Sequence, residues 1–461
     1  MSKICDIDES GDVLVTYTHS EKDGLQCVRC ILSPWGYNPT NHRDEKTHTP
    51  LPKAVLYAFL PAGFPHTVTD DYLAYQTFDS LQAFSSSITN LLANRAILEG
   101  LGVGNASQTP TTALFLQIIQ DTFSRLATIL FAHRMGQAIE PECKYYRFLA
   151  DIFNDCSQFL DLLLPALPLL PKVSVMVSAS VLRSLCGVAA GASKATLSAH
   201  FAKTGNLAEL NAKEQSQETV VSLMGMLAGT LLVKLVEGKT AVWCWMVILV
   251  SIHLITNYYG VRAVKMRTLN RQRATIVFRE WLDSNAILSP TEVARRESIL
   301  FNSRGNMTSR TGEYRGTADF GGYGDVMNFR PWGHYRYVFD TEDYFMGIWQ
   351  WGPSFTIRIA VKEGKRSVND PLMAWFDAVA HAYHFDTAIF KYGLGGTSQY
   401  ENEVPDDHRV GSGVVDRETK KAVVEALKAK GWEVENVVVE TRNPIRVRMG
   451  GPGSDKALKG M

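Results

Sequence analysis

Residues 241–260, AVWCWMVILVSIHLITNYYG, form an apolar run that contains no Asp, Glu, Lys or Arg. A helix of this length extends about 30 Å, the thickness of the hydrocarbon core of a bilayer. Trp243 and Trp245 stand near its start and Tyr258 and Tyr259 near its end, where an aromatic belt would lie. The run predicts a transmembrane helix, and the alternative is the buried core helix of a large soluble bundle.

Basic residues follow this run directly. They are Arg262, Lys265, Arg267, Arg271 and Arg273. Positive charge close to the end of a transmembrane helix favours the cytosolic side of the membrane. We therefore expect the carboxyl end of this helix to face the cytosol or its topological equivalent.

Two further apolar segments precede it, at residues 173–192 and 220–236. Arg183 lies inside the first segment, and Lys234 lies near the end of the second. A charged side chain is costly at bilayer depth unless it is paired or reaches the interface. We predict that both segments also cross the membrane, with a soluble core helix as the alternative for each.

Each of these two segments carries a GxxxG motif. Gly187 and Gly191 form the first, and Gly225 and Gly229 form the second. In lipid, small residues at this spacing let helix backbones approach closely. We expect the four glycines to serve helix packing. If the two segments pair through them, the polar stretch between the segments is held at their junction.

That polar stretch, residues 194–219, is the candidate ligand-binding region. Broken helices with polar connections form the binding sites of many transporters, and lysines there are available for a phosphate group. The candidate ligand-binding residues are Lys194, His200, Lys203, Lys213, Glu214, Gln217 and Glu218.

Composition limits the other functional classes. Lys plus Arg and Asp plus Glu both number 47, so the formal net charge is zero, and we expect no nucleic-acid partner. The seven cysteines form no regular framework, which indicates a reducing compartment. The acidic N-terminus has no apolar core, so we expect a membrane location without an N-terminal signal or transit peptide.

No catalytic motif stands out in the sequence. Asp151 and Asp155, four residues apart on a predicted helix, could bind a metal ion, but no further ligands lie near them in the sequence. His381 and His384 also lack a third ligand. We therefore expect no catalytic residues, no metal and no cofactor, and a protein that is not an enzyme.

The predicted fold class is mainly α: a helical, membrane-embedded bundle followed by a small α+β C-terminal domain. Residues 1–52 predict a flexible arm with a short hairpin, and residues 53–301 predict the helical domain. Residues 302–331 are rich in Gly, Ser, Thr and Asn, which indicates a linker. Residues 332–461 combine alternating strand patterns with helices, one of which ends at Gly431.

Several stretches together resemble the root UVB sensitive family, also called vitamin B6 photoprotection and homeostasis proteins. The matching stretches are LPAGFP at 60–65, GLGVG at 100–104, GVAAGA at 187–192, AKE at 212–214, SQET at 216–219 and TLN at 268–270. The resemblance implies membrane association and a role linked to vitamin B6. It implies no catalytic residues, because no settled biochemical activity accompanies the family.

Two hypotheses follow. The first is a membrane protein that acts in vitamin B6 homeostasis by binding or transporting a small metabolite, namely a B6 vitamer or another small anion. The second is a membrane-anchored interaction scaffold without transport activity, whose C-terminal domain binds a protein partner. In both, the lipid bilayer is a partner of the chain.

Overall fold

The chain, described by a computed structural model, separates into two compact units. The helical unit holds residues 1–132 and 146–264, and the second unit holds residues 133–145 and 265–461. The boundary after the last long apolar helix therefore lies at residue 264, not at the expected residue 301. The structure describes residues 3–7, 13–20, 24–30, 59–101, 110–203, 205–236, 238–300, 305–328, 336–351, 353–363, 370–391, 407–410 and 414–449.

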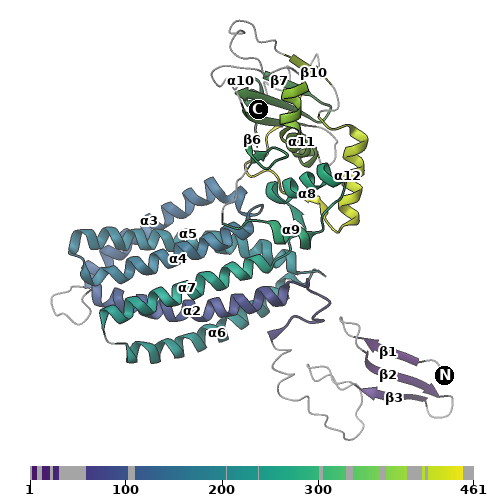
Figure 1. The fold of residues 1–461 in the computed structure, drawn as a ribbon. Coiled ribbons are helices and arrows are strands. Elements are labelled where there is room, and N and C mark those ends of the chain that lie inside the picture. Colours follow the sequence, from purple (N-terminus) through teal and green to yellow (C-terminus); the bar gives the residue numbers. More distant parts are fainter. Residues whose placement is uncertain are drawn as a thin grey trace, which may run out of the picture. The chain divides into compact units, whose positions relative to one another are not determined.

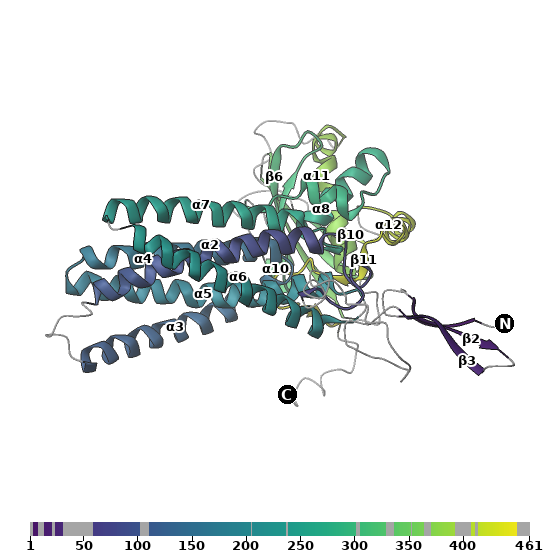
Figure 2. The same ribbon diagram turned by 90° about the horizontal axis from the view of Figure 1, so that it is seen from below.

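Six long helices lie side by side in the described part of the helical unit (Figures 1 and 2). They are α2 (Tyr72–Gly100), α3 (Pro110–Ile139), α4 (Cys143–Leu163), α5 (Leu169–Phe201), α6 (Leu207–Leu235) and α7 (Lys239–Ala263), with a short 3₁₀ turn, η1 (Leu164–Ala166), after α4. The last residues of α3, from 133 on, and the first three of α4 belong to the second unit. Short connections make helices that are consecutive in sequence antiparallel. Gly260 near the end of α7 faces Phe78 near the start of α2. The chain therefore enters and leaves the bundle at the same end.

Four helices among the described residues are long and apolar enough to cross a membrane, namely α3 over Leu114–Ile139, α5, α6 and α7. Apolar side chains lie on their outer surfaces: Ile129 of α3 is 65% exposed and Leu227 of α6 is 63% exposed. The first and third segments predicted from the sequence fall within α5 and α7, and the second ends at Val236, one residue beyond α6. The sequence did not predict the fourth, α3, because Asp121 and Arg125 interrupt its apolar run.

The two GxxxG motifs do not pack on each other, so the pairing that the sequence left open is not found. Gly225 and Gly229 of α6 lie against α2, where a Cβ atom on either glycine would stand 2.7 Å from an α2 atom. A Cβ atom placed on Gly187 or Gly191 of α5 would meet no neighbouring element within 4 Å among the described residues. A GxxxG face accepts any helix with a complementary surface, and the sequence does not specify which helix that is.

A small antiparallel sheet precedes the helices. It consists of β1 (Lys3–Ile7), β2 (Val13–Ser20) and β3 (Gly24–Cys30), in that spatial order. The predicted hairpin corresponds to β2 and β3, which pair directly. The region expected to be a flexible arm thus contains regular structure, while residues 31–52 lie outside the described part of the chain.

The second unit is built on a mixed sheet with the strand order β10-β7-β8-β9-β6-β5. Strands β7, β8 and β9 form an antiparallel meander, and β6 lies parallel to β9. The strands are β5 (Asn306–Thr308), β6 (Tyr314–Phe320), β7 (Arg336–Asp340), β8 (Tyr344–Trp351), β9 (Ser354–Lys362) and β10 (Asp407–Val410), and β12 (Arg446–Val447) pairs with β9.

Helices cover this sheet and enclose its core. The rings of Phe278 on α8 (Arg271–Ser284) and Phe376 on α11 (Asp370–Lys391) stack with centroids 4.6 Å apart. Alternate residues of β9 join the same core as these rings, while Ala360 packs with Val326 of α10 (Tyr323–Asn328) in a separate cluster. The remaining elements are α9 (Pro290–Arg296), α12 (Arg417–Ala429), β4 (Thr268–Leu269) and β11 (Glu433–Val437).

The segment expected to be a linker, residues 302–331, contributes β5, β6 and α10 to this unit. Its glycine content misled the prediction, because a glycine also permits close approach of two strands. Gly316 of β6 is an example: a Cβ atom there would overlap the carbonyl oxygen of Phe355 on β9. The helix that ends at Gly431 follows the prediction, since Gly431 has a positive φ of 86° and follows Lys430, the C-cap residue of α12.

Candidate functional site

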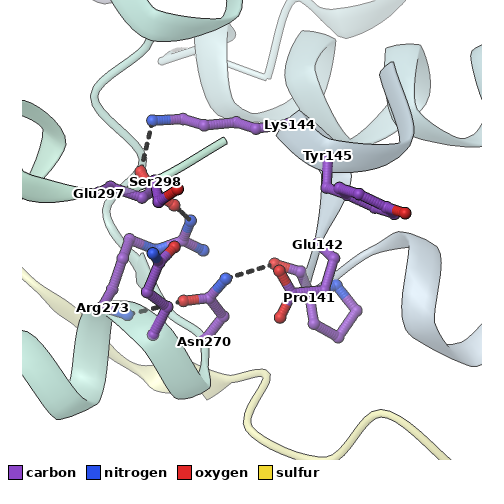
Figure 3. A pocket seen from close by; sticks show the side chains of 9 residues that line it. Pro141, Glu142, Lys144, Tyr145, Asn270, Arg273, Glu297 and Ser298 are labelled. Atoms are coloured by element: carbon purple, nitrogen blue, oxygen red, sulfur yellow. Dashed lines mark hydrogen bonds and ion pairs between the residues drawn. The ribbon is translucent and has the colours of Figure 1, made fainter. Parts of the chain in front are cut away.

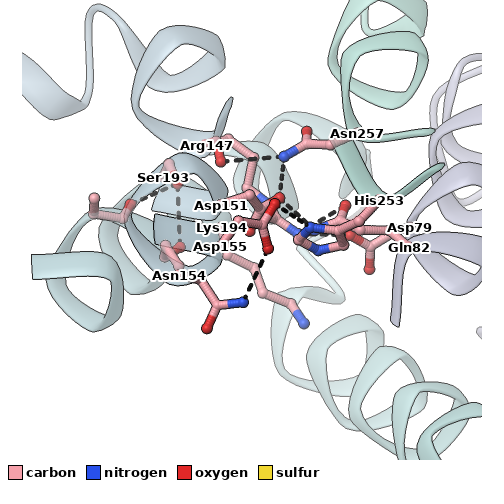
Figure 4. Close-up of polar contacts among 12 residues, drawn as sticks. Asp79, Gln82, Arg147, Asp151, Asn154, Asp155, Ser193, Lys194, His253 and Asn257 are labelled. Carbon is pink, nitrogen blue, oxygen red and sulfur yellow. Dashed lines mark hydrogen bonds and ion pairs between the residues drawn. The ribbon is translucent and has the colours of Figure 1, made fainter. Parts of the chain in front are cut away.

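Arg147, near the start of α4, is the centre of a buried polar cluster (Figure 4). Its guanidinium group contacts Asp79 of α2 at 2.9 Å and Asp151, one turn further along α4, at 3.1 Å. The side chains of Arg147 and Asp151 are only 11% and 8% exposed. A buried guanidinium of this kind is tolerated because carboxylates pair with it and satisfy its N–H groups.

Asp151 connects three helices. Its carboxylate accepts hydrogen bonds from the amide of Gln82 on α2 and from the amide of Asn257 on α7. Asn257 is 2% exposed and Gln82 is 6% exposed, so both amides are buried. We call Asp79, Gln82, Arg147, Asp151 and Asn257 the Arg147 cluster. It fixes α2, α4 and α7 to one another through polar contacts.

The cluster forms because α4 carries its polar residues on one face. Arg147, Asp151, Asp155 and Gln158 recur every three or four residues, the spacing that places side chains on the same side of a helix. That face points toward α2 and α7, since its partners come from those two helices. Polar residues inside a bundle with apolar outer surfaces are the arrangement found around solute and ion sites in membranes.

Lys194, a residue predicted from the sequence, lies next to this cluster (Figure 4). Its ammonium group pairs with Glu218 of α6 at 2.9 Å, and Asp79 and Glu214 are among its other electrostatic neighbours. Glu214 accepts a hydrogen bond from Ser198 Oγ at 3.3 Å and is 3% exposed. We call Lys194, Ser198, Glu214 and Glu218 the Lys194 group. It joins α5 to α6 beside the Arg147 cluster.

The other predicted site residues are more dispersed. His200 pairs with Asp71 at 3.1 Å, and Lys203 lies 3.5 Å from the exposed Asp70, both beyond the Lys194 group toward the end of α5. Gln217 donates to the backbone carbonyl of Phe59. Lys213 is half-buried on α6.

Several buried polar atoms near these groups have no hydrogen-bond partner in the described part of the chain. They include Oε1 of Gln76 on α2 and Oε1 of Glu214 on α6, and both side-chain polar atoms of Asn206. An unsatisfied buried acceptor costs free energy unless water or a ligand supplies a donor. This end of the bundle therefore contains hydrogen-bonding groups to which a polar molecule could bind.

Sequence reasoning missed Arg147, Asp79, Gln82, Asn257 and His253. Their partners on other helices are far away in the sequence: Arg147 and Asp79 are 68 positions apart, and His253 and Asp155 are 98 positions apart. Asp151 and Asp155 were recognised, but as a possible metal pair. The polar face of α4 could have indicated the buried cluster from the sequence. A polar helix face among apolar helices needs hydrogen-bond partners inside the bundle.

A second polar cluster lies within the second unit and surrounds a cavity of about 10 Å³ (Figure 3). Lys144 binds one carboxylate oxygen of Glu297 at 2.6 Å, and Arg273 binds the other at 2.8 Å. Asn270 donates to the carbonyl of Pro141 at 3.0 Å. The cavity has room for about one water molecule. We interpret this cluster as structural.

The charge of Glu297 fits that interpretation. Burial alone would raise the pKa of its carboxyl group, but Lys144 and Arg273 outweigh burial and hold the pKa below its usual value. Glu297 is therefore a carboxylate held between two cations, which secures the segment around residue 144 to α8 and to the residues after α9.

Another buried ionic group holds the core of the second unit together. Asp377 of α11 is fully buried and accepts hydrogen bonds from Tyr344 Oη, from Lys420 Nζ at 2.9 Å and from the Val415 backbone N–H at 2.9 Å. Burial raises the pKa of the Asp377 carboxyl group even though these donors oppose the shift. The group joins α11, β8 and α12.

Comparison with known proteins places the helical unit in a family. Residues 45–285 match the vitamin B6 photo-protection and homoeostasis domain, which is more than half of the chain. These residues include the Arg147 cluster and the Lys194 group. No solved structure matches the chain.

Two curated relatives are similar to about half of the chain. The chain is 39% identical over 248 residues to RUS family member 1 of Dictyostelium discoideum, covering 53% of this chain and 47% of that protein. It is 37% identical over 249 residues to protein root UVB sensitive 3 of Arabidopsis thaliana, covering 54% and 56%. The chain spans about half the length of these curated relatives. On the match of its helical domain, the chain belongs to the root UVB sensitive family.

Proposed function

We propose that this chain is a membrane-embedded, non-enzymatic protein that binds and transports a small anionic metabolite in vitamin B6 homeostasis. The observation that carries the proposal is the Arg147 cluster together with the Lys194 group, a polar interior within helices whose outer surfaces are apolar. Charged side chains inside such a bundle mark the paths of solutes and ions. The domain name of the family suggests the B6 vitamers as the ligand class.

The membrane part of the proposal draws on α3, α5, α6 and α7. Their apolar outer surfaces would be costly in water but fit a bilayer. The one charged side chain that the sequence places in the middle of α5, Arg183, pairs with Asp161 of α4. Arg262 and Lys265 at the end of α7 favour the cytosol for the end of the bundle where the chain enters and leaves.

The ligand part of the proposal draws on two cations and on buried hydrogen-bond acceptors that have no donor among the described residues. Arg147 and Lys194 are cations suited to a phosphate or carboxylate group, and Arg147 presents the fork that binds such groups in pairs of hydrogen bonds. The open acceptors of Gln76 and Glu214 would receive hydroxyl or N–H donors from the same molecule. An anion would replace Asp79 or Asp151 on Arg147, and this exchange of partners supplies two states for a transport cycle.

A binding experiment tests the ligand part. The full-length protein in detergent is titrated with pyridoxine 5′-phosphate, which has no aldehyde and so forms no Schiff base with lysines. We expect Arg147→Lys and Lys194→Gln each to weaken binding at least tenfold. Lys203→Gln serves as the matched control and should bind as the wild type does, because Lys203 pairs with the exposed Asp70. Absence of binding to the wild type, or equal binding by all four proteins, refutes the proposal.

Alkaline extraction of cell membranes tests the membrane part separately. An embedded protein stays in the membrane pellet at high pH, while a peripheral or soluble protein is released. Recovery of the chain in the soluble fraction would remove the basis for transport and leave only ligand binding to be considered.

An interaction scaffold is the second candidate function. It is favoured by the second unit, which has a hydrophobic core of its own and its own buried ionic groups. Rescue experiments in cells that lack the endogenous protein distinguish the two functions. A folded Arg147→Lys, Lys194→Gln double variant should fail to restore growth if metabolite binding is the function. It should restore growth fully if the chain serves only as a scaffold.

A further inference from the structure

The polar face of α4 continues well beyond the Arg147 cluster. Asp155 pairs with His253 of α7 at 2.8 Å, Gln158 donates to Asn90 of α2 at 2.9 Å, and Asp161 binds Arg183 of α5. From Arg147 to Asp161 the face extends about 21 Å along the helix axis, roughly two thirds of a hydrocarbon core. We call Arg147, Asp151, Asp155, Gln158 and Asp161 the α4 stripe.

Charge along the stripe does not balance. Three carboxylates of the stripe, those of Asp151, Asp155 and Asp161, and the neighbouring Asp79 of α2 share two guanidinium groups, those of Arg147 and Arg183. Lys194 is a further cation near Asp79, but it pairs with Glu218 and also lies near Glu214, so it does not remove the excess of negative charge. The four aspartate carboxylates are at most 13% exposed. An excess of buried negative charge is expensive, and a bound proton is the simplest way to reduce it.

His253 is the group placed to hold that proton. It is 2% exposed, and its Nδ1 lies against the carboxylate of Asp155. With Nδ1–H donating to Asp155, the second ring nitrogen, Nε2, is the position at which an extra proton binds. The other titratable neighbours of this pair are Asp151, Arg147 and Cys156 on α4 and Cys186 on α5, and Asp79 of α2 joins them through Arg147.

Gln158 supplies an independent observation that points to a bound molecule. It is 1% exposed, and its Oε1 has no hydrogen-bond partner among the described residues. It lies three residues from both Asp155 and Asp161 on the same face of α4. A buried acceptor of this kind is usually satisfied by water. A water molecule bound to Gln158 would lie between the Asp155–His253 pair and Asp161 along the helix axis.

We infer that the Asp155–His253 pair is a proton-binding site and that the α4 stripe is a proton path, which couples proton movement to the anionic solute. A hydronium ion in the stripe gives one proton to Nε2 of His253 and becomes water, and release is the reverse step. The inference rests on the membrane-embedded function proposed above. It adds a second transported species, and it assigns α4, α5 and α7 a role that solute binding alone does not require.

Infrared titration measures protonation of His253 directly and does not require the anionic solute. The full-length protein, with carbon-13 in its histidine rings, is placed in lipid nanodiscs and stepped from pH 8 to pH 5. The chain has 11 histidines, so the His253→Gln variant identifies the contribution of His253 by difference. We expect that variant to lose one reversible conversion from imidazole to imidazolium. Asp155→Asn should move the same conversion toward acid by about one pH unit or more, because the carboxylate that favours imidazolium is gone.

Two controls accompany these variants. Ser251→Ala alters an exposed residue of α7 whose hydroxyl donates to the Val247 carbonyl of its own helix, and it should leave the conversion unchanged. His200→Gln removes a different paired histidine and should leave the His253 component intact. The inference is overturned if His253→Gln loses no titrating component, or if Asp155→Asn leaves its midpoint where it is. If Asp155→Asn does not fold, the His253→Gln result still decides.

A second measurement separates this inference from the proposed function. Binding of pyridoxine 5′-phosphate is compared at pH 5 and pH 8 in the wild type and in His253→Gln. Coupling predicts binding at least threefold tighter at the pH where His253 carries its proton, and loss of that pH difference in the variant. Equal pH dependence in the two proteins overturns the inference and leaves the proposed function standing. Failure of the wild type to bind at either pH refutes the proposed function.

Discussion

Gly229 of α6 lies so close to Leu91 of α2 that a Cβ atom on the glycine would stand 2.7 Å from Leu91 Cδ1. Gly225, one turn earlier, meets the Phe84 carbonyl oxygen and the Ser87 side chain at the same distance. A backbone oxygen cannot move away as a flexible side chain can. These two glycines therefore set the separation of α2 and α6.

Alanine substitutions at the two GxxxG motifs should have opposite effects. Gly225→Ala overpacks the contact with α2 and should cost about 1–3 kcal/mol. The added methyl group of Gly187→Ala meets nothing within 4 Å in the described part of the chain, so it should stabilise α5 by up to about 1 kcal/mol through helix propensity. Thermal unfolding of both variants in the same detergent checks the signs. A lower Tm for Gly187→Ala would mean that the exposed motif packs on something in the assembled protein.

Removing the charge of Arg147 should be strongly destabilising. Arg147→Gln leaves Asp79 and Asp151 buried without their cation, and we expect a loss of about 3–5 kcal/mol. Adding Asp151→Asn should recover part of that loss, because one uncompensated charge is removed. Glu218→Gln is the control, since the Lys194–Glu218 pair is about one third exposed and is worth about 1 kcal/mol or less. Unfolding of the four proteins followed by tryptophan fluorescence provides the comparison.

Glu297 should make the second unit sensitive to acid. Its pKa is lower in the folded state than in the unfolded chain, so its stabilising effect is complete above about pH 4.3 and is lost as pH falls through the folded value. Glu297→Gln should therefore be less stable than the wild type at pH 7 and should lose less stability on acidification. Glu425→Gln, at an exposed pair with Lys428, should follow the wild type. Equilibrium unfolding between pH 7 and pH 3 measures both slopes.

Asp377, the partner of Lys420, should respond to acid in the opposite sense to Glu297, because the pKa of its carboxyl group is raised in the folded protein and not lowered. Lys420→Met leaves Asp377 fully buried without a cation and should cost about 3–5 kcal/mol at pH 7. A carboxyl group whose folded pKa is raised binds a proton more readily in the folded state, so lowering the pH should restore part of the loss. Lys421→Met, at the exposed neighbouring position, should change little at any pH. A Lys420→Met defect that is equal at pH 7 and pH 5 would contradict this account.

The sequence predicted the long helices better than their partners. The apolar runs within α5, α6 and α7 were recognisable because length and hydropathy are local properties. The contact of Gly225 with α2 was not, because a small-residue face fits several neighbours and the choice among them depends on the whole bundle. The linker expected at residues 302–331 failed for a related reason, since Gly316 serves strand contact with Phe355 and not chain flexibility.

The residues of the candidate site also divide into those that local sequence predicts and those whose partners depend on the whole bundle. Lys194 and Glu218 were found because they stand in a visibly polar stretch, and they do pair with each other. Arg147, Asn257 and His253 lie within helices, far in the sequence from most of their partners, and the sequence shows that they need partners without showing which ones. Asp151 and Asp155 were noticed for their spacing, but hydrogen bonds from other helices explain them better than a metal does.

The antiparallel bundle begins and ends on one side, with Phe78 near its entry and Gly260 near its exit. In a membrane, whatever precedes α2 and whatever follows α7 would share one compartment. Sequences could then be added, lost or exchanged at either end during evolution without any new segment being translocated. The curated relatives match only about half of this chain and about half of their own length, so each protein also has a part that the two do not share.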